Sequence, residues 1–549
     1  MRSGGVSVLE AGFASDAIAR GIVMPGARDP GESDRARVAR AVRAGGAAPD
    51  DAAVVPGVAP LGEAVELGAI SDRSVRVWLR MPDVARVAVR LEVEDGPQVV
   101  VDATAGPDTD WTAAVELALP ESHPDRPFAV TVGPPLGRTL HGRLAPPQGA
   151  PASFTFAFGS CNLAFRERRG RVMPARAAGI YDAMADDLER TDARFALWIG
   201  DQVYADGCDA LSVDALVAPH DGTAVDDGRL LAAYRFITRC YLGVPGFAAL
   251  RRRFPSLCMW DDHEILDDWG AHVVDGDHDR ARLRAASRAY AEYQHARNPG
   301  GAAAAAPPFA WRFAYGDCAF VGLDMRGRRD LGRRQALGEE QWRELEGWLA
   351  GEEAEQVATL FVVVVMPVAH AARWFVRALE HLPVRIASAV RDRWCSSYFT
   401  GERDRLLGAL RAWRARRPER QVVLLSGDVH AASAFTIRER DGGGLIHQLT
   451  SSALASPIGA VARVLSRIAT RGGSLLEPEH EIERHFQCFA NNYGLVHVRP
   501  RPGGGHAVRF VVRAFDPRRQ ELRTAGAVEI GPADAVALAT DRDTYLFNE

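Results

Sequence analysis

The sequence has few cysteines, no long uninterrupted hydrophobic segment and no strong excess of charge of either sign. Its 549 residues include 7 cysteines. This odd number shows neither the paired spacing of a disulfide framework nor a C-x-x-C zinc motif. We therefore expect reduced cysteines, as in a cytosolic protein.

The hydrophobic runs and the net charge exclude further classes of protein. The strongest apolar run, ATLFVVVVMPVA at 358–369, is too short to span a bilayer and contains a proline. The N-terminus has no long apolar segment and no twin-arginine pair. A formal net charge of −5 is too small to indicate a nucleic-acid or membrane partner. These features predict a cytoplasmic protein without a membrane span, unless a mis-assigned start codon hides an export signal.

Composition and periodicity divide the chain into three parts. Residues 1–57 are rich in Ala, Gly, Asp and Arg, and we expect an N-terminal extension that is partly disordered or wraps over the rest. Residues 58–148 contain short strand-like runs, such as SVRVWLRM and RVAVRLEV, separated by Gly, Pro and Asp. This spacing predicts a small antiparallel β-sandwich of the immunoglobulin or fibronectin type.

From residue 154 to 549 the pattern is typical of an α/β protein. Apolar β-rich runs such as FTFAFGSC, FALWIGD and VVLLSGD alternate with helical stretches such as GIYDAMADDLER. Runs of this kind are buried on both faces and suit a sheet that is covered by helices. We expect this region to be one α/β domain.

Four of the apolar runs end in polar residues of metal-binding type. In chain order these are Cys161, then Asp201 with Tyr204, then Asp261–Glu264, and finally Asp428 with His430. Ligands of α/β sheets gather at the carboxyl ends of strands, so these side chains are expected to converge. Each motif alone is weak, because a Gly-Asp pair after a strand is usually a turn. Together they indicate a cation site, since cations offset the cost of burying several carboxylates.

Five motifs occur in one order along the chain: FAFGSCN, LWIGDQVYADG, MWDDHEILDDW, VGLDMRGRR and LLSGDVHAASAF. This series resembles that of the PhoD-like alkaline phosphatases and phosphodiesterases, within the calcineurin-like metallophosphoesterase superfamily. The resemblance covers residues 58–515 approximately, because the family also carries an N-terminal β-sandwich. It implies a four-layer metallophosphoesterase β-sandwich flanked by helices.

The resemblance also implies a site with two metal ions, iron(III) and calcium in the family, with other divalent metals as alternatives. The motif positions of the first metal's ligands match Cys161, Asp201, Tyr204, Asp428 and His430, and Asp201 would bridge to the second metal. A thiolate, a phenolate and two carboxylates are anionic donors, which suits a trivalent ion. The structural alternatives are a small buried apolar role for Cys161 and core packing for Tyr204.

The second metal is assigned through the motif DDHE. This motif occupies the place of the superfamily's Gly-Asn-His-Glu, which implies Asp262 as a ligand of the second metal. His263 would then stabilise or protonate the leaving oxygen. Close relatives often carry asparagines where this chain has Asp267 and Asp268, so these two are alternative ligands. They are equally well interpreted as the turn that begins a helix.

Two further side chains are candidates for the site. Arg326 matches the arginine of the family's Asp-x-Arg motif, and a guanidinium holds phosphate oxygens in a bidentate manner. A salt bridge to Asp324 or another acid is the alternative. His370 follows the run VVVVMPVA. It is at least as well explained as a core histidine, and we leave it out of the predicted site.

These implications predict a metal-dependent phosphomonoesterase or phosphodiesterase whose nucleophile is a metal-activated hydroxide. Its substrate would be a small-molecule, lipid or nucleotide phosphoester. Two alternatives are open: a metallohydrolase acting on another ester or an amide, and a non-catalytic scaffold that binds a ligand through the sandwich. The sequence determines neither the natural substrate nor the oligomeric state.

Overall fold

The computed structural model describes residues 58–538, apart from 169–170, 209, 218–225, 272–275, 303–304, 382–385, 441–443, 457–473 and 477–479. The predicted N-terminal extension, residues 1–57, lies outside the described residues. Within the described part of the chain, no helix is both long and apolar enough to cross a membrane.

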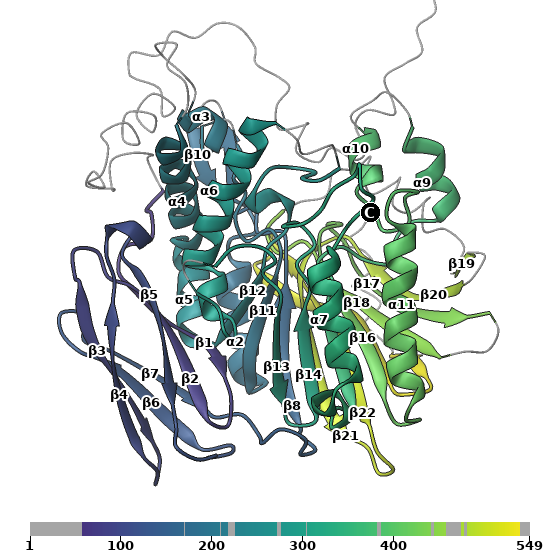
Figure 1. The fold of residues 1–549 in the computed structure, drawn as a ribbon, viewed down its shortest axis with the longest axis horizontal. Helices are drawn as coiled ribbons and strands as arrows, with labels where there is room; N and C mark the ends of the chain where they lie inside the picture. The colour runs from purple at the N-terminus through teal and green to yellow at the C-terminus, as the bar shows by residue number, and fades with distance from the viewer. Residues whose placement is uncertain are drawn as a thin grey trace, which may run out of the picture.

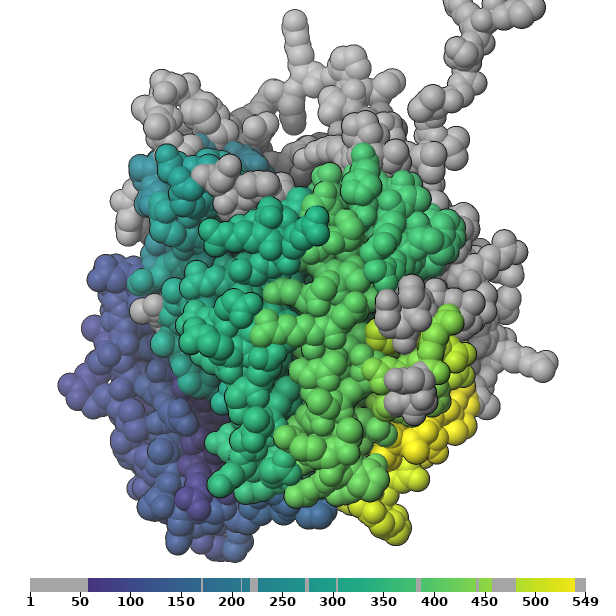
Figure 2. Space-filling view, turned by 45° about the vertical axis from the view of Figure 1, so that its right-hand side comes forward, coloured from purple at the N-terminus to yellow at the C-terminus, as the bar shows by residue number. Residues whose placement is uncertain are grey.

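Two antiparallel sheets form the first part of the described chain, purple and blue in Figures 1 and 2. The order of the first sheet is β1 (Ala64–Ile70), β2 (Ser74–Arg80) and β5 (Thr112–Ala118). The order of the second is β4 (Gln98–Thr104), β3 (Arg86–Val93), β6 (Pro127–Val132) and β7 (Arg138–Arg143). Strand β3 alternates exposed and buried residues along its whole length, and the buried residues of both sheets share one apolar core.

Six of these strands coincide with strand-like runs of the sequence. Strand β7, RTLHGR, was not predicted, and it contains no fully buried residue. A strand without an apolar face gives no alternation of hydrophobicity, so only its pairing with β6 reveals it.

The rest of the described chain contains two larger sheets with helices, and the predicted α/β class is confirmed. The order of one sheet is β12 (Ser256–Met259), β11 (Ala193–Ile199), β8 (Phe154–Gly159), β21 (Asn491–Pro500), β22 (His506–Asp516), β23 (Glu521–Ile530) and β24 (Ala535–Ala537). The order of the other is β13 (Trp311–Tyr315), β14 (Cys318–Gly322), β15 (Thr359–Val363), β16 (Gln421–Ser426), β18 (Leu445–Thr450), β17 (Ala432–Glu439), β20 (His480–Cys488) and β19 (Ser474–Leu476).

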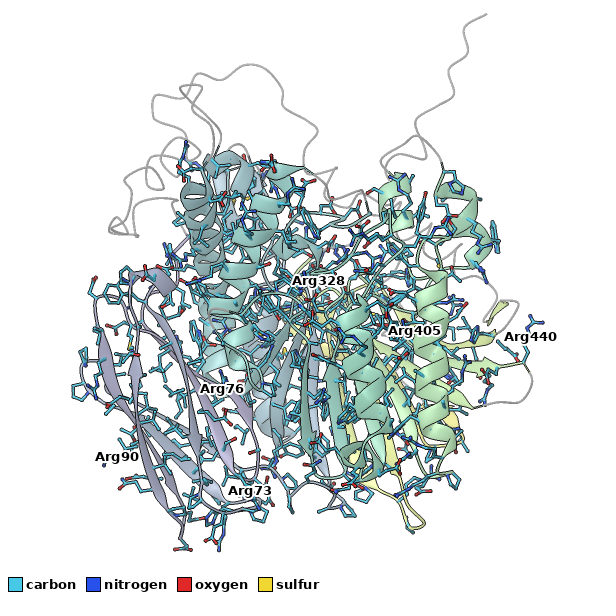
Figure 3. All side chains as sticks on the ribbon, viewed as in Figure 1. Arg73, Arg76, Arg90, Arg328, Arg405 and Arg440 are labelled. Carbon is cyan, nitrogen blue, oxygen red and sulfur yellow. The ribbon has the colours of Figure 1, made fainter. Side chains whose placement is uncertain are left out.

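Aromatic side chains pack the two larger sheets against each other. The ring of Phe156 in β8 lies 5.2 Å from that of Phe320 in β14 and 5.3 Å from that of Phe361 in β15, between centroids. Helix α2 (Ile180–Arg190) contacts β11, β21 and β23, and α11 (Thr400–Ala415) contacts β16 and β18 of the other large sheet. Arg405 of α11 donates to both carboxylate oxygens of Glu346 in α7 (Glu339–Ala350), which lies beside α11 (Figures 1 and 3).

The strand ends of the two larger sheets meet closely where the predicted ligands lie. Strands β8, β11 and β12 run parallel, as do β14, β15 and β16, so their carboxyl ends share one edge. A Cβ atom on Gly427, after β16, would lie 2.1 Å from Ser160 Oγ, after β8. Glycine is therefore required before Asp428 for this close approach.

A cluster of buried charges joins the first pair of sheets to the rest of the chain. Glu66 of β1 forms ion pairs of 2.9 Å with Arg251 of α5 (Pro245–Arg253) and with Arg297. The guanidinium of Arg297 also lies 4.0 Å above the ring of Trp78 in β2. Burial would raise the pKa of Glu66, but the two arginines lower it below its ordinary value.

Candidate metal centre

The turns after β8, β11 and β16 bring the predicted ligands of the first metal together. Cys161 Sγ lies 3.3 Å from Asp201 Oδ2 and 3.5 Å from the carbonyl oxygen of Asp428. The hydroxyl oxygen of Tyr204 lies 3.5 Å from Asp201 Oδ2. His430 is on the same turn as Asp428 and is 9% exposed. The five residues therefore lie in one group, in which Asp428 is half-buried and the other four are buried.

The backbone at these turns adopts a conformation that most residues avoid. The angle φ is 56° at Cys161, 57° at Asp201, 59° at Asp428 and 52° at His430. A left-handed residue other than glycine costs about 1 kcal/mol or more, and such residues cluster at functional sites. The strain is evidence that these turns are shaped to aim their side chains rather than to form relaxed loops.

Glu264 connects the turn after β11 to the loop after β12. Its carboxylate accepts hydrogen bonds from the backbone N–H groups of Asp201, Gln202, Val203 and Asp261, at 2.8 to 3.1 Å. Burial raises the pKa of Glu264 to about 7, against the opposing effect of these hydrogen bonds. No separate role was predicted for Glu264, although it belongs to the DDHE motif.

Asp262 lies where two groups of potential ligands overlap. Its carboxylate is within 4.8 Å of ligand atoms of Asp201 and His263, and also of ligand atoms of Asp268 and Asp392. The backbone N–H of Asp268 donates to Asp262 Oδ2 at 2.6 Å. Asp262 and Asp268 are therefore both placed to share a second cation.

Asp392 was not predicted, although it belongs to the second of these groups. It lies in the sequence RDRW between α10 (Ile386–Arg391) and α11, where no strand and no family motif precedes it. The only local signal is a charged run next to a buried tryptophan, Trp394. That signal is too common to indicate a ligand.

The carboxylates of the centre are not fully balanced by protein groups. Asp201 Oδ1, Asp261 Oδ2 and Asp262 Oδ1 are buried and have no hydrogen-bond partner among the described residues. Burial, with neighbouring carboxylates, raises the pKa of Asp201 and Asp261 well above its ordinary value. Burial likewise raises the pKa of the Cys161 thiol, so that only a bound cation would favour its thiolate. The residues present therefore fit metal ions that prefer carboxylate oxygens.

His263 is held by Asp206, which was not predicted to belong to the site. Its Nδ1 lies 2.8 Å from Asp206 Oδ1, while Asp206 Oδ2 accepts the backbone N–H of Asp267. The imidazole packs on the ring of Tyr204, with centroids 4.1 Å apart. Burial opposes protonation, but the surrounding carboxylates, with Asp206 the strongest, raise the pKa of His263 well above its ordinary value. These carboxylates therefore favour the protonated imidazole.

Arg326 is fully buried, and acids surround it. Its guanidinium donates to both carboxylate oxygens of Asp392 at 2.9 Å, to the carbonyl of Trp269 and to Asp261. Asp324 instead accepts the backbone N–H of Arg326. The salt-bridge alternative thus describes its contacts, with Asp261 and Asp392 in place of Asp324. Binding of phosphate oxygens by Arg326 stays a prediction.

Two more polar side chains belong to this region. Arg393 forms an ion pair with Asp428 Oδ2, and its side chain is 18% exposed. His370 Nδ1 is buried without a hydrogen-bond partner among the described residues. Burial, with the nearby charge of Arg393, lowers the pKa of His370 to about 3, so its imidazole is neutral. A neutral imidazole can accept a hydrogen bond or bind a metal.

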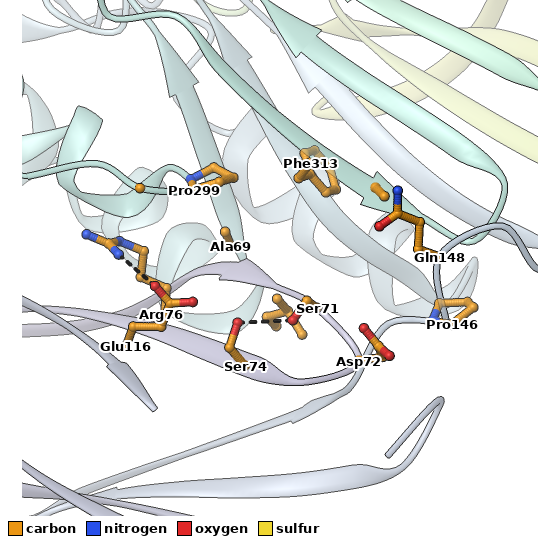
Figure 4. A pocket seen from close by; sticks show the side chains of 13 residues that line it. Ala69, Ser71, Asp72, Ser74, Arg76, Glu116, Pro146, Gln148, Pro299 and Phe313 are labelled. Carbon is orange, nitrogen blue, oxygen red and sulfur yellow. Dashed lines mark hydrogen bonds and ion pairs between the residues drawn. The ribbon is translucent and has the colours of Figure 1, made fainter. Parts of the chain in front are cut away.

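The pocket in Figure 4 lies away from this centre. It has a volume of about 250 Å³, and its lining includes Asp72 and Arg76 of the β1–β2 hairpin, Glu116 of β5 and Phe313 of β13. None of the predicted ligands lines it.

Known phosphatase structures share this fold. A solved structure described as PhoD has a TM-score of 0.62 and 18% identity, covering 87% of this chain and 92% of that chain. The purple acid phosphatase PPD1 from yellow lupin (Lupinus luteus) seeds has a TM-score of 0.52 and 12% identity, covering 89% of this chain and 76% of that chain. At such identities the likeness shows the fold alone, which is metallophosphoesterase-like.

The family model described as PhoD-like phosphatase matches residues 156–501, more than half of the sequence. The chain belongs to the PhoD-like phosphatase family, and the resemblance seen in its motifs is confirmed. The family implies a phosphatase, and family and fold together imply metal cofactors. No curated protein matches the sequence.

Proposed function

We propose that this protein hydrolyses phosphoesters at a site with two metal ions. The observation that carries the proposal is the pair of buried carboxylate oxygens without hydrogen-bond partners among the described residues, on Asp201 and Asp261. Buried charge of this kind is costly unless a cation compensates it. Membership of the PhoD-like phosphatase family supports a small-molecule, lipid or nucleotide phosphoester as the substrate.

We assign the first metal to the residues that offer a thiol, a phenol, two carboxylates and an imidazole: Cys161, Asp201, Tyr204, Asp428 and His430. The second metal is assigned to Asp262, with Asp201 between the two. The proposed ions are iron(III) and calcium, with other divalent ions as alternatives. Bound there, the cations would lower the pKa of a water molecule to supply the nucleophile and would neutralise phosphoryl oxygens.

His263 is proposed as the acid that protonates the leaving alcohol. Asp206 binds Nδ1, which fixes the orientation of the imidazole and leaves Nε2 directed towards Asp267 at 3.8 Å. Packing on Tyr204 further restrains the plane of the ring. The raised pKa keeps a proton on the imidazole for transfer to an alkoxide oxygen.

The finer division of the fold is also a proposal. Residues 58–148 would be an immunoglobulin-like or fibronectin-like sandwich, and residues 154–549 a four-layer catalytic domain. The separate apolar core of the first two sheets and the aromatic packing between the larger sheets support this division.

The substitution Asp201→Asn tests the proposed reaction. It keeps the size of the side chain but removes the charge that would bridge both metals. We expect kcat/KM for an aryl phosphate and for a phosphodiester to fall by at least about 100-fold, with the circular dichroism spectrum unchanged. The matched control is Asp72→Asn in the pocket of Figure 4, which should retain wild-type turnover.

Undiminished hydrolysis by Asp201→Asn, with its metal content verified, would disprove the proposal. If the wild-type protein instead cleaves carboxylic esters or amides but no phosphoester, the site belongs to another metallohydrolase. Ligand binding without any turnover would indicate a scaffold.

A further inference from the structure

Three arginines lie among the acids of the metal centre, and they differ in exposure. The side chains of Arg326 and Arg329 are 0% and 1% exposed. Both form ion pairs with Asp392, and the guanidinium of Arg329 also lies 3.8 Å from the ring centroid of Phe399. Neither guanidinium can reach a substrate without breaking buried contacts. The side chain of Arg393 is 18% exposed, so it can meet a molecule that enters from solvent.

Arg393 is also the arginine that is paired with a proposed metal ligand. Its Nη1 forms an ion pair with Asp428 Oδ2, and Asp392 and Asp268 are further acids in its field. Its charge acts on Asp262, His370 and His430 as well, which places it close to the middle of the cluster. The guanidinium therefore neutralises part of the charge that the cations would neutralise.

A cation on Asp428 and the guanidinium of Arg393 compete for the same carboxylate. A bound cation takes up the charge of Asp428 and repels the guanidinium, which weakens the ion pair. Arg393 remains charged at any accessible pH, and its planar fork matches the oxygens of a phosphate in a bidentate manner. Released from Asp428, it can bind an anion held beside the metals.

We propose that Arg393, and not Arg326, binds the phosphoryl oxygens of the substrate, and that its ion pair with Asp428 is exchanged for this contact when the metals bind. This inference rests on the proposed phosphoesterase function, which it deepens. It predicts two effects of opposite sign for removal of the guanidinium. The cation should bind at least as tightly, because its competitor for Asp428 is lost, whereas phosphate should bind more weakly.

The test compares Arg393→Gln and Arg393→Lys with Arg377→Gln. Arg377 is an exposed arginine on helix α9 (Arg373–Leu379), whose Val376 packs in one apolar cluster with Val390 and Cys395. Its substitution therefore removes the same charge from the same region, and no ion pair of Arg377 with Asp428 is present in the described part of the chain. Inorganic phosphate binding to the metal-loaded proteins is measured by isothermal titration calorimetry, and cation binding to the metal-free proteins by equilibrium dialysis.

For Arg393→Gln we expect phosphate affinity to fall roughly tenfold to one-hundredfold while cation affinity is unchanged or higher. Arg393→Lys should lie in between, because an ammonium keeps the charge but not the fork. Arg377→Gln should match the wild type in both measurements. If Arg393→Gln does not fold, as judged by circular dichroism, Arg393→Lys carries the test.

Phosphate affinity within twofold of wild type in a fully metal-loaded Arg393 variant would overturn the proposal. So would weaker cation binding by Arg393→Gln, because Arg393 would then support the metals rather than compete with them. Absence of phosphate binding by the metal-loaded wild type would also overturn it. The proposed function fails separately, if the wild type binds metals and phosphate but hydrolyses no phosphoester.

Discussion

Two clusters of buried charge in the described part of this protein differ in how their charges are compensated. At the junction of the first sheets with the rest of the chain, Glu66 is enclosed by Arg251 and Arg297, and both of its oxygens are in ion pairs. At the metal centre, Asp201 Oδ1 is buried and has no hydrogen-bond partner among the described residues.

The direction of the pKa shifts shows the same contrast. The pKa of Glu66 is lowered, because its arginines outweigh burial, so its charge stabilises the fold. The pKa of Asp201 is raised by burial and by neighbouring acids, so its charge destabilises the metal-free fold. Balanced buried charge thus connects parts of the structure, whereas unbalanced buried charge indicates a cation.

The largest expected effect on stability is at the junction. Glu66→Ala would leave Arg251 and Arg297 buried without their counter-charge. We expect it to lower the free energy of unfolding by about 3–5 kcal/mol, as measured by urea denaturation followed by tryptophan fluorescence.

The control for this variant is Glu116→Ala, which removes a half-exposed ion pair with Arg76 of 3.4 Å. That change should cost less than about 1 kcal/mol. A similar loss of unfolding free energy in both variants would mean that the buried ion pairs of Glu66 stabilise the fold no more than a half-exposed ion pair does.

Removal of metal is expected to have the next largest effect. Cations at the centre would stabilise the folded protein by about 2.7 kcal/mol when their concentration is 100 times the dissociation constant. A chelator should therefore lower the melting temperature of the wild type, and added iron(III) and calcium should restore it. The chelator should affect Asp201→Asn much less. Equal melting temperatures of the wild type with and without chelator would remove the contrast between the two clusters.

The smallest effect is expected for Asp268→Asn, with a sign that depends on metal. Burial, with neighbouring carboxylates, raises the pKa of Asp268 well above its ordinary value. Ionisation of this carboxyl as the pH rises therefore lowers the free energy of unfolding. In metal-free protein at neutral pH, the substitution should therefore stabilise the fold by about 1 kcal/mol. Asparagine also tolerates the φ of 57° at this position. Denaturation curves at pH 7 and at acidic pH measure the gain, which should vanish in acid.

In metal-loaded protein, the same substitution should weaken binding of the second cation. Calcium titrations of Asp268→Asn and Asp262→Asn would then rank the two acids as ligands. Destabilisation of Asp268→Asn in both states would instead identify Asp268 as a structural turn residue.

Much of the candidate metal centre could be predicted from the sequence because the residues proposed as ligands lie at the ends of apolar strands. Cys161, Asp201 and Asp428 each follow a run whose burial is evident from composition, and the structure brings all three together. A polar residue at the carboxyl end of such a run lies at the edge of the sheet where the neighbouring parallel strands also end. This pattern involves only neighbouring residues, so it can be recognised without knowledge of the tertiary packing.

The residues that were missed are those whose role depends on distant partners. Asp206 is identified only by its contact with His263, and Asp392 and Arg393 only by their contacts with Arg326 and Asp428. Each pair is separated by 35 or more residues along the chain. No local pattern marks one of these side chains as a partner of the other.

The sequence by itself determined the family, the α/β class and the set of polar residues at the strand ends, because motifs and apolar runs are properties of neighbouring residues. Only the tertiary structure decided which charges are balanced. Arg326 and Arg393 are the same residue type in the sequence. Arg326 is enclosed by Asp261 and Asp392, whereas Arg393 is partly exposed beside Asp428. The electrostatic role of a side chain depends on its solvation and on charges within a few ångströms, and chain folding sets both.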